Sequence, residues 1–215
     1  MERVERAPKE TRGGNDAMKL GTHNSATGGK LLWWLKPLAW VINPTSKCQD
    51  RTIADQLSDG VKVFNLQVAY IGGKWRFSHG LALYKEDVIE TLAMMKACAT
   101  KKEPIYFQLY LDKCLWCKQD EIKFIELIAQ IMNEFLDDKL MMFDPWIEGT
   151  NEHLKMGNVF EKISLEEHYW TMGWAKTTKK WYNYIPLPKR HAKKYNKEYK
   201  DKCKSKYLML DFYEL

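Results

Sequence analysis

The chain has 215 residues, of which 45% are hydrophobic and 29% are charged, and its formal net charge is +6. Its longest apolar run, residues 31–42, is interrupted by Lys36 and Pro37 and is far shorter than the ~20 residues that span a bilayer, which excludes a transmembrane helix. Five cysteines and no apolar export signal in residues 1–16 predict reduced thiols in a cytoplasmic protein. We expect a disordered tail over residues 1–16 and one domain over residues 17–215.

The first half of the chain predicts alternating strands and helices. In order, these are a strand over 17–22, a loop over 25–30, a short helix over 31–42 broken near Pro37, a helix over 53–59 capped by Thr52 and ended by Gly60, a strand over 61–70 and a strand over 74–79. Apolar residues on both faces of the strand over 61–70 are typical of a central strand. Gly72-Gly73 predicts a tight turn between the last two strands.

The second half continues the alternation, although the pattern over 149–188 is weak. It predicts a helix over 85–100, a strand over 105–111, an amphipathic helix over 119–136 with Ile122, Ile125, Ile128 and Met132 at helical spacing, a short strand over 140–143, a basic helix over 188–204 and a strand over 207–213. Strands that alternate with helices favour an α/β fold, a parallel sheet or barrel built from crossovers. In such a barrel the site lies at the C-terminal ends of the strands.

Polar side chains stand at or close to the C-terminal ends of several predicted strands. They are His23, Asn65, Gln67, His79, Tyr110 and Asp211. Packing alone does not explain why polar groups would gather at one mouth of a barrel. We therefore expect these residues to form the functional site.

Two further segments suit a membrane surface. Trp33 and Trp34 belong either to a helix packed on the core or to an exposed lip that enters the membrane interface, where tryptophan is favoured. Residues 176–206 contain twelve Lys/Arg against Glu198 and Asp201. This segment is a solvated basic face, a contact for anionic membrane or a binder of single-stranded nucleic acid. Of the two ligands we favour membrane and expect no nucleic-acid partner.

Several short stretches, taken in order and spacing, resemble the X domain of phosphatidylinositol-specific phospholipases C. They are Gly21-Thr-His-Asn-Ser25, Cys48-Gln49, Thr52-Ile53, Gln56-Leu57, Gly60-Val-Lys-Val-Phe64 and His79-Gly80. The similarity covers residues 18–84, with looser matches at 104–110 and 210–212. The resemblance implies a single irregular TIM-type barrel, the fold class that the alternation also suggests.

The resemblance also implies a phosphodiesterase that uses two histidines. His23 would be the general base and His79 the general acid, in a cleavage where the inositol 2-hydroxyl attacks phosphorus and forms a cyclic phosphate. Asp211 would orient His23, and Asn24 would be a partner of His79 or a calcium ligand. The implied partners are an inositol phospholipid or related phosphodiester and an anionic membrane surface, with the protein peripheral to the membrane and monomeric.

Three positions depart from the family pattern. The calcium-dependent branch has carboxylates where this chain has Asn65, Gln67 and Tyr110, so we expect no metal cofactor. The metal-independent branch has an arginine at the position of Gln67, and losing one such stabiliser costs ~10²–10³ in rate. These three residues are expected to contact substrate, with activity weak, redirected to another phosphodiester or absent.

Two alternatives to an active phosphodiesterase remain open. One is a non-catalytic relative that binds inositol-phosphate head groups or anionic membrane. The other is a thiol redox protein that uses Cys114 and Cys117, a CxxC pair between a strand and a helix.

Overall fold

The computed structural model describes residues 19–147, 170–172, 188–202 and 207–215. Its elements are β1 (Lys19–Thr22), η1 (Ser25–Gly28), η2 (Trp33–Leu38), α1 (Ala39–Ser46), α2 (Ile53–Ser58), β2 (Val63–Ile71), β3 (Lys74–His79), β4 (Ala82–Asp87), α3 (Val88–Cys98), β5 (Ile105–Leu111), α4 (Glu121–Glu134), β6 (Leu140–Ile147), β7 (Trp170–Met172), α6 (Pro188–Lys202) and β8 (Tyr207–Leu210). The expected tail over residues 1–16 lies outside the described residues. No described helix is both long and apolar enough to cross a membrane.

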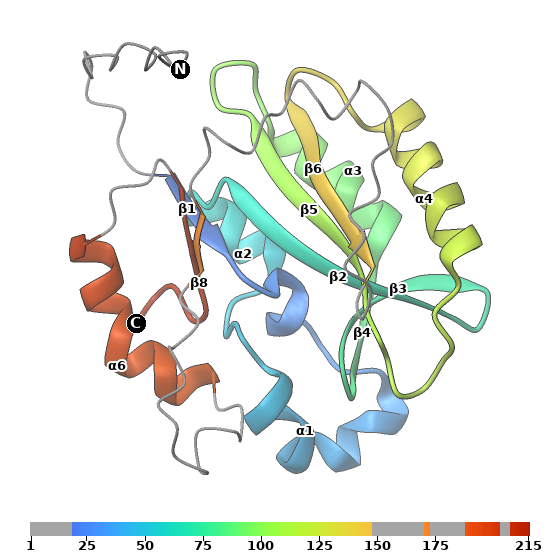
Figure 1. Cartoon of the computed structure of the whole chain (residues 1–215), viewed down its shortest axis with the longest axis horizontal. Coiled ribbons are helices and arrows are strands. Elements are labelled where there is room, and N and C mark those ends of the chain that lie inside the picture. Colours follow the sequence, from blue (N-terminus) through green and yellow to red (C-terminus); the bar gives the residue numbers. More distant parts are fainter. Residues whose placement is uncertain (1–18, 148–169, 173–187, 203–206) are drawn as a thin grey trace, which may run out of the picture.

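The strands form one curled sheet, shown in Figure 1 with α6 beside β8 and α4 beside β6. Strands β7, β8, β1, β2, β5 and β6 are neighbours in that order and are all parallel, whereas β3 and β4 are antiparallel additions. Parallel strands joined through helices curl into a barrel. The predicted α/β class and irregular TIM-type barrel are therefore confirmed.

One face of the sheet is covered by helices. Phe64 and Leu66 of β2 pair in register with Phe107 and Leu109 of β5, and all four side chains are fully buried. They share one apolar cluster with side chains of α3 and α4, among them Leu92, Met95, Phe124 and Ile128. Because side chains alternate along a strand, Asn65, Gln67, Gln108 and Tyr110 belong to the opposite face, the inside of the curl.

The edge of β2 opposite β5 is shared by two strands that approach from opposite directions. Parallel β1 pairs with Val63 and Phe64, and antiparallel β3 pairs with residues 68–71. On its other edge, β2 pairs with β5 over Val63–Val68. The C-terminal ends of β1 and β3 therefore point toward each other across the short unpaired interval between them.

The strand bounds correct two sequence predictions. Asn65 and Gln67 lie in the middle of β2 and not near its C-terminal end, because β2 continues to Ile71 in its hairpin with β3. The helix expected over 85–100 begins only at Val88, where the Asp87 carboxylate accepts hydrogen bonds from the N–H groups of Ile89 and Glu90. The residues before it form β4, which pairs with β3 and contacts Leu31.

The amphipathic helix α4 is confirmed, but its buried face is not the expected one. Ile122 and Ile125 are 73% and 42% exposed, whereas the side chains that pack inward are Phe124, Leu127, Ile128 and Ile131. That set follows the i, i+3, i+4, i+7 spacing of a helix face and includes the large Phe124 ring. Relative to the orientation expected from the isoleucine spacing, the helix is therefore turned about its axis so that Phe124 is buried.

Candidate active site

His23 and Asn24 follow directly from the end of β1. The His23 N–H donates to the Leu210 carbonyl of β8 at 3.1 Å, which continues the pairing of the two strands by one residue. Asn24 then adopts a left-handed conformation with φ of 46°, which asparagine tolerates better than most residues. Its N–H donates to the Asn65 side-chain oxygen at 3.1 Å. The chain therefore turns sharply and directs two polar side chains to the inside of the curl.

The His23 ring is held by Asp211, as the resemblance implied. Asp211 directly follows β8, and its Oδ1 lies 2.9 Å from His23 Nδ1. Because a carboxylate oxygen only accepts, Nδ1 carries the proton and Nε2 is the basic nitrogen. Gln49 supports the pair from behind, since its Nε2 donates to the carbonyl oxygens of both His23 and Leu210 at 2.8 Å.

His79 ends β3 and is held by two groups that the sequence did not single out. Its Nδ1 donates to the Ser46 carbonyl oxygen at 2.7 Å. Gly80 follows with φ of +59°, and its N–H donates to the Asp112 Oδ2 at 2.9 Å. Ser46 ends α1 and Asp112 follows β5, both more than 30 residues away in sequence, so neither spacing nor strand pattern signals these contacts.

Asn24 lies between the two histidines. Its Nδ2 donates to His79 Nε2 at 3.2 Å, and it touches His23 Nδ1 at 3.4 Å without a hydrogen bond, because that nitrogen carries the proton donated to Asp211. The side chain is 2% exposed, and its Oδ1 is buried without a hydrogen-bond partner in the described structure. Four of the predicted catalytic residues, His23, Asn24, His79 and Asp211, are thus in one connected cluster.

The three positions that depart from the family pattern line the sheet beside this cluster. Asn65 bridges it to β5, because its Oδ1 accepts from Asn24 and its Nδ2 donates to Gln108 Oε1 at 2.9 Å. Gln67 and Tyr110 are partners in the β2–β5 register and are both partly exposed. Their amide and hydroxyl groups lie on the same inner face as Asn65, with no carboxylate among them.

Cys48 is a member of the cluster that sequence reasoning did not assign. Its Sγ accepts from Asn24 Nδ2 at 3.4 Å and lies 3.9 Å from His79 Nδ1. The side chain is 1% exposed, and burial, followed by the nearby Asp211 charge, raises the pKa of the thiol well above its usual value. Cys48 belongs to one of the stretches that carry the family resemblance, and this membership is the sequence feature that could have identified it as a site residue.

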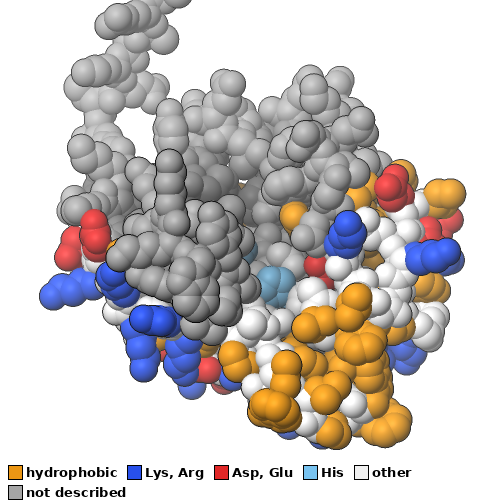
Figure 2. Space-filling view, turned by 60° about the horizontal axis from the view of Figure 1, so that its bottom comes forward, with side chains coloured by type: hydrophobic (Ala, Val, Ile, Leu, Met, Phe, Trp, Pro, Cys, Tyr) orange, Lys and Arg blue, Asp and Glu red, His pale blue; other side chains and the backbone are white. Residues whose placement is uncertain are grey.

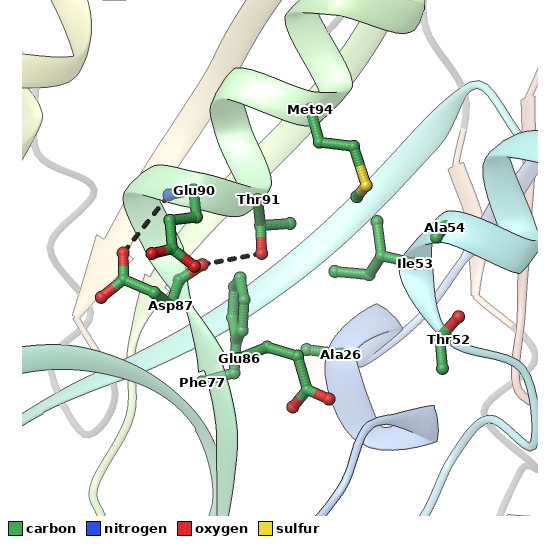
Figure 3. Close-up of a pocket in the computed structure, with 10 residues that line it drawn as sticks. All are labelled: Ala26, Thr52, Ile53, Ala54, Phe77, Glu86, Asp87, Glu90, Thr91 and Met94. Atoms are coloured by element: carbon green, nitrogen blue, oxygen red, sulfur yellow. Dashed lines mark hydrogen bonds between the residues drawn. The ribbon is translucent and has the colours of Figure 1, made fainter.

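A cavity away from the histidine cluster does not suit a phosphate ester. It encloses about 250 Å³ between η1, α2, β3 and α3 (Figure 3). Its charged lining residues are Glu86, Asp87 and Glu90, and Asp87 also caps α3. Like charges repel an anionic substrate, so we assign the site to the histidine cluster and not to this cavity.

An apolar surface lies near the histidines. Figure 2 shows hydrophobic side chains gathered at the bottom of the view with histidine surface just above them. Trp33 and Trp40 are 78% and 79% exposed, and Leu38, Val41, Leu115 and Trp116 are exposed as well. Trp34 behaves differently, because it is half-buried and packs edge-on against Trp116 at 5.2 Å between ring centroids. We call this surface, formed by Trp33, Leu38, Trp40, Val41, Leu115 and Trp116, the apolar lip.

The two thiols of the CxxC pair are free, and both have raised pKa values. Cys114 and Cys117 are both free thiols, and burial raises the pKa of Cys114 to about 12. The pKa of Cys117 is raised by the same cause. Reactive thiols have lowered pKa values, which makes the redox alternative unattractive.

With this geometry established, comparison with solved structures places the fold among bacterial phosphatidylinositol-specific phospholipases C. The F249X mutant of the Staphylococcus aureus enzyme aligns with a TM-score of 0.54 at 14% identity, over 92% of this chain and 87% of that chain. The Listeria monocytogenes enzyme aligns with a TM-score of 0.56 at 12% identity, over 92% and 89% of the two chains. No protein-family model and no curated sequence matches the chain. At such identities the likeness shows the fold alone.

Proposed function

We propose that this protein is a phosphodiesterase that cleaves inositol phospholipid or a related phosphodiester by two-histidine acid–base catalysis. The observation that carries the proposal is the cluster in which Asn24 connects a histidine held by a carboxylate to a histidine held by a carbonyl. Proton removal requires an imidazole with an unprotonated nitrogen, and His23 Nε2 is unprotonated because Nδ1 carries the proton. Proton delivery requires a second acid–base group nearby, and His79 provides it.

In the proposed reaction His23 removes the proton of the inositol 2-hydroxyl through Nε2. The resulting oxygen nucleophile attacks the neighbouring phosphorus, the bond from phosphorus to the diacylglycerol oxygen breaks, and His79 delivers a proton to that oxygen. The Asp211 carboxylate stabilises the imidazolium that forms on His23. The products are a cyclic inositol phosphate and diacylglycerol, with no change in oxidation state.

The substrate class is supported by the fold and by the surface. The structural neighbours are named as phosphatidylinositol-specific phospholipases C, and one structure of the S. aureus enzyme concerns modulation of its membrane binding. The apolar lip of this chain suits insertion at a bilayer interface, and the basic helix α6 suits anionic lipid. The protein would then act as a monomer at the membrane surface.

The proposed reaction does not need a metal cofactor. A calcium site calls for several charged oxygen ligands, and the positions beside the histidines hold Asn65, Gln67 and Tyr110. The same residues leave the phosphorane without a cation, so we expect a rate ~10²–10³ below that of a site with one.

The test is phosphorus NMR of the purified protein with phosphatidylinositol, with and without EDTA. We expect slow formation of cyclic inositol phosphate that EDTA does not reduce. His23→Ala and His79→Ala should each lower the rate ~10²–10⁴-fold while the thermal melting profile is retained. Normal turnover in either variant would refute the assignment, and no product under any condition would favour the non-catalytic binder of inositol-phosphate head groups.

A further inference from the structure

The histidine cluster contains a sulfur ligand that the proposed reaction does not use. The ligand atoms of His23, Cys48 and Asp211 all lie within 4.8 Å of one another. Imidazole, thiolate and carboxylate together are typical ligands of Zn²⁺ and similar ions, whereas Ca²⁺ prefers oxygen. We infer that these three residues form a binding site for a borderline divalent ion such as Zn²⁺, and that an ion bound there switches the site off.

The spacing of the three residues is close to that of a coordinated set. Bonds of 2.0–2.3 Å in a tetrahedron place ligand atoms about 3.3–3.8 Å apart. In the metal-free structure, His23 Nδ1 and Asp211 Oδ1 are 2.9 Å apart and share a hydrogen bond. No two ligand atoms of the three residues are more than 4.8 Å apart. Side-chain shifts of about 1 Å or less therefore bring all three atoms to bonding distance. The thiol proton of Cys48 goes to solvent, and the ring proton of His23 moves from Nδ1 to Nε2, so that the imidazole binds the ion as a neutral ligand.

Asn24 offers a fourth ligand. Its Nδ2 lies 3.4 Å from both His23 Nδ1 and Cys48 Sγ, so the amide already sits against two members of the set. A half-turn of the amide exchanges this nitrogen for Oδ1, the buried oxygen that has no hydrogen-bond partner in the described structure. Coordination would satisfy an acceptor that the metal-free arrangement leaves unpaired, while the turn breaks the hydrogen bonds from Nδ2 to His79 Nε2 and Cys48 Sγ.

The predicted inhibition rests on the proposed function, whereas the binding does not. An ion on His23 Nδ1 leaves the single ring proton on Nε2, so the proposed base has no free nitrogen to accept a proton from substrate. The positive charge of the ion beside the ring also disfavours a second ring proton. The turn of the Asn24 amide removes its hydrogen bond to His79 Nε2 at the same time.

Binding can be measured without any enzyme assay. Metal-free protein is titrated with Co²⁺, whose visible absorption is intense in tetrahedral sites and whose near-ultraviolet charge-transfer band reports a thiolate ligand. We expect one such site in the wild type, displaced by Zn²⁺. Cys48→Ser and Asp211→Asn should each weaken binding by at least the ~10–100-fold that loss of an outer-shell partner costs.

The other thiols provide matched controls. Cys98→Ser removes an exposed thiol and Cys117→Ser removes one thiol of the CxxC pair, and both variants should bind Co²⁺ as the wild type does. Absorption that survives in Cys48→Ser but disappears in Cys117→Ser would place the ion at the CxxC pair and overturn the inference. So would the absence of a tetrahedral thiolate spectrum in the wild type. Because Asp211→Asn removes a different ligand, the result does not depend on the folding of Cys48→Ser.

Inhibition is measured separately with the phosphorus NMR assay. Zn²⁺ should stop cyclic phosphate formation by the wild type and EDTA should restore it, while a functioning Cys48→Ser should need at least 10-fold more Zn²⁺, in line with its weaker binding. Unaltered activity at saturating Zn²⁺ would contradict the switch. If the wild type has no phosphodiesterase activity, the proposed function fails, but the Co²⁺ spectrum still decides whether the site exists.

Discussion

The amide of Asn24 lies between two imidazoles, and its two ends suit opposite protonation states. With Nδ2 toward His79 Nε2 at 3.2 Å, the amide donates to a neutral ring. A protonated Nε2 instead needs an acceptor, which a half-turn of the amide supplies through Oδ1. On the proposed assignment, the orientation in the structure therefore matches the state after His79 has delivered its proton, and reprotonation of His79 would require the amide to turn.

Asn24→Asp tests this coupling at the level of one side chain. A carboxylate at this position lies next to both rings and favours their protonated forms, so the pKa values of His23 and His79 should rise. The base then loses its proton only at higher pH and the acid keeps its proton to higher pH. We expect the whole bell-shaped pH–rate profile to move to higher pH, by about 1 unit for a partly solvated carboxylate.

The pH dependence of kcat/KM, measured for both proteins, gives the result. Asn24→Ala serves as the control, because it removes the amide without adding charge and should lower the rate without moving the profile upward. A profile of Asn24→Asp that coincides with that of the wild type would show that Asn24 does not contact the titrating groups.

The Gln67→Arg substitution tests whether the rate is limited by the lack of a positively charged side chain beside the phosphate. Gln67 is partly exposed on the inner face of β2, beside Tyr110 of β5 and two residues beyond Asn65. A guanidinium there can pair with the phosphoryl oxygens as charge builds up, which should raise the rate of cyclic phosphate formation about 10-fold or more. The gain should fall short of ~10³ because no carboxylate among Asn65, Gln67 and Tyr110 orients the arginine.

Initial rates of the wild type and Gln67→Arg, each with and without EDTA, provide the measurement. Gln67→Met matches the side chain in length but adds no charge, and it should not raise the rate. If activity requires calcium, the arginine should inhibit by repelling the ion and EDTA should abolish the reaction. That outcome would make Asn24, together with Asp112 next to Gly80, the candidate calcium ligands.

For single residues, the sequence was sufficient to place the site residues that end a strand. It was not sufficient to identify partners that come from segments distant in sequence. His23, His79 and Asp211 were predictable because the ends of legible strands point into the site. The Ser46 carbonyl belongs to the last residue of α1 and Cys48 follows that helix, so the approach of both depends on how η2 and α1 pack. No local pattern encodes that packing, so these partners appear only in three dimensions.

Element boundaries were less predictable wherever tertiary pairing decided them. Residues 85–87 read as the start of a helix, yet they extend β4, because β3 pairs on one side and residues 30–32 bond on the other. The α4 helix has apolar residues around more than half of its circumference, so spacing alone does not select the face that Phe124 buries. Strand β5, which has strict alternation and clear ends, was predicted with its exact bounds.

A hydrogen bond ties the last residues of the chain to α2. The Tyr213 hydroxyl donates to the Asp59 carboxylate, which also pairs with Arg51. The Tyr213 hydroxyl, followed by the Arg51 guanidinium, holds the pKa of Asp59 below its usual value. A lowered folded-state pKa stabilises the protein above the unfolded-state pKa of ~3.9, and this contribution is lost as the pH falls through the folded-state value.

Tyr213→Phe should therefore lower the melting temperature at pH 7, and the difference from the wild type should shrink as the pH is taken well below ~3.9. Thermal unfolding followed by circular dichroism across this range supplies the data. Tyr70→Phe removes a hydroxyl from β2, away from Asp59, and should show no such pH dependence. A Tyr213→Phe deficit that is the same at every pH would mean that the contact with the carboxylate contributes no stability.

Across the whole molecule, the proposed membrane contact combines two separate surfaces. The apolar lip includes Trp33 and Trp40, both more than three-quarters exposed, while α6 presents exposed Lys193 and Lys194. Trp34, which was expected beside Trp33 as a membrane contact, instead packs on Trp116 and is a poor choice for a binding test. A basic residue contributes only ~1 kcal/mol near an anionic surface, so both surfaces are needed.

Sedimentation with vesicles containing anionic lipid separates the two contributions. Trp33→Ala with Trp40→Ala should weaken binding at all salt concentrations. Lys193→Glu with Lys194→Glu should weaken it only at low salt, because ~0.1 M salt screens charges beyond about 10 Å. Ile122→Ala, an equally exposed apolar position on α4, is the control and should bind normally. Equal binding by all variants would indicate a soluble substrate.

The pairing of β1 with β8 has a consequence for the timing of synthesis. His23 and its partner Asp211 are 188 residues apart, and the strand that delivers Asp211 ends at Leu210. A ribosome therefore completes the proposed base, the proposed acid and the amide between them long before it adds Asp211. On the proposed assignment, the nascent polypeptide lacks the group that orients the base until β8 pairs with β1.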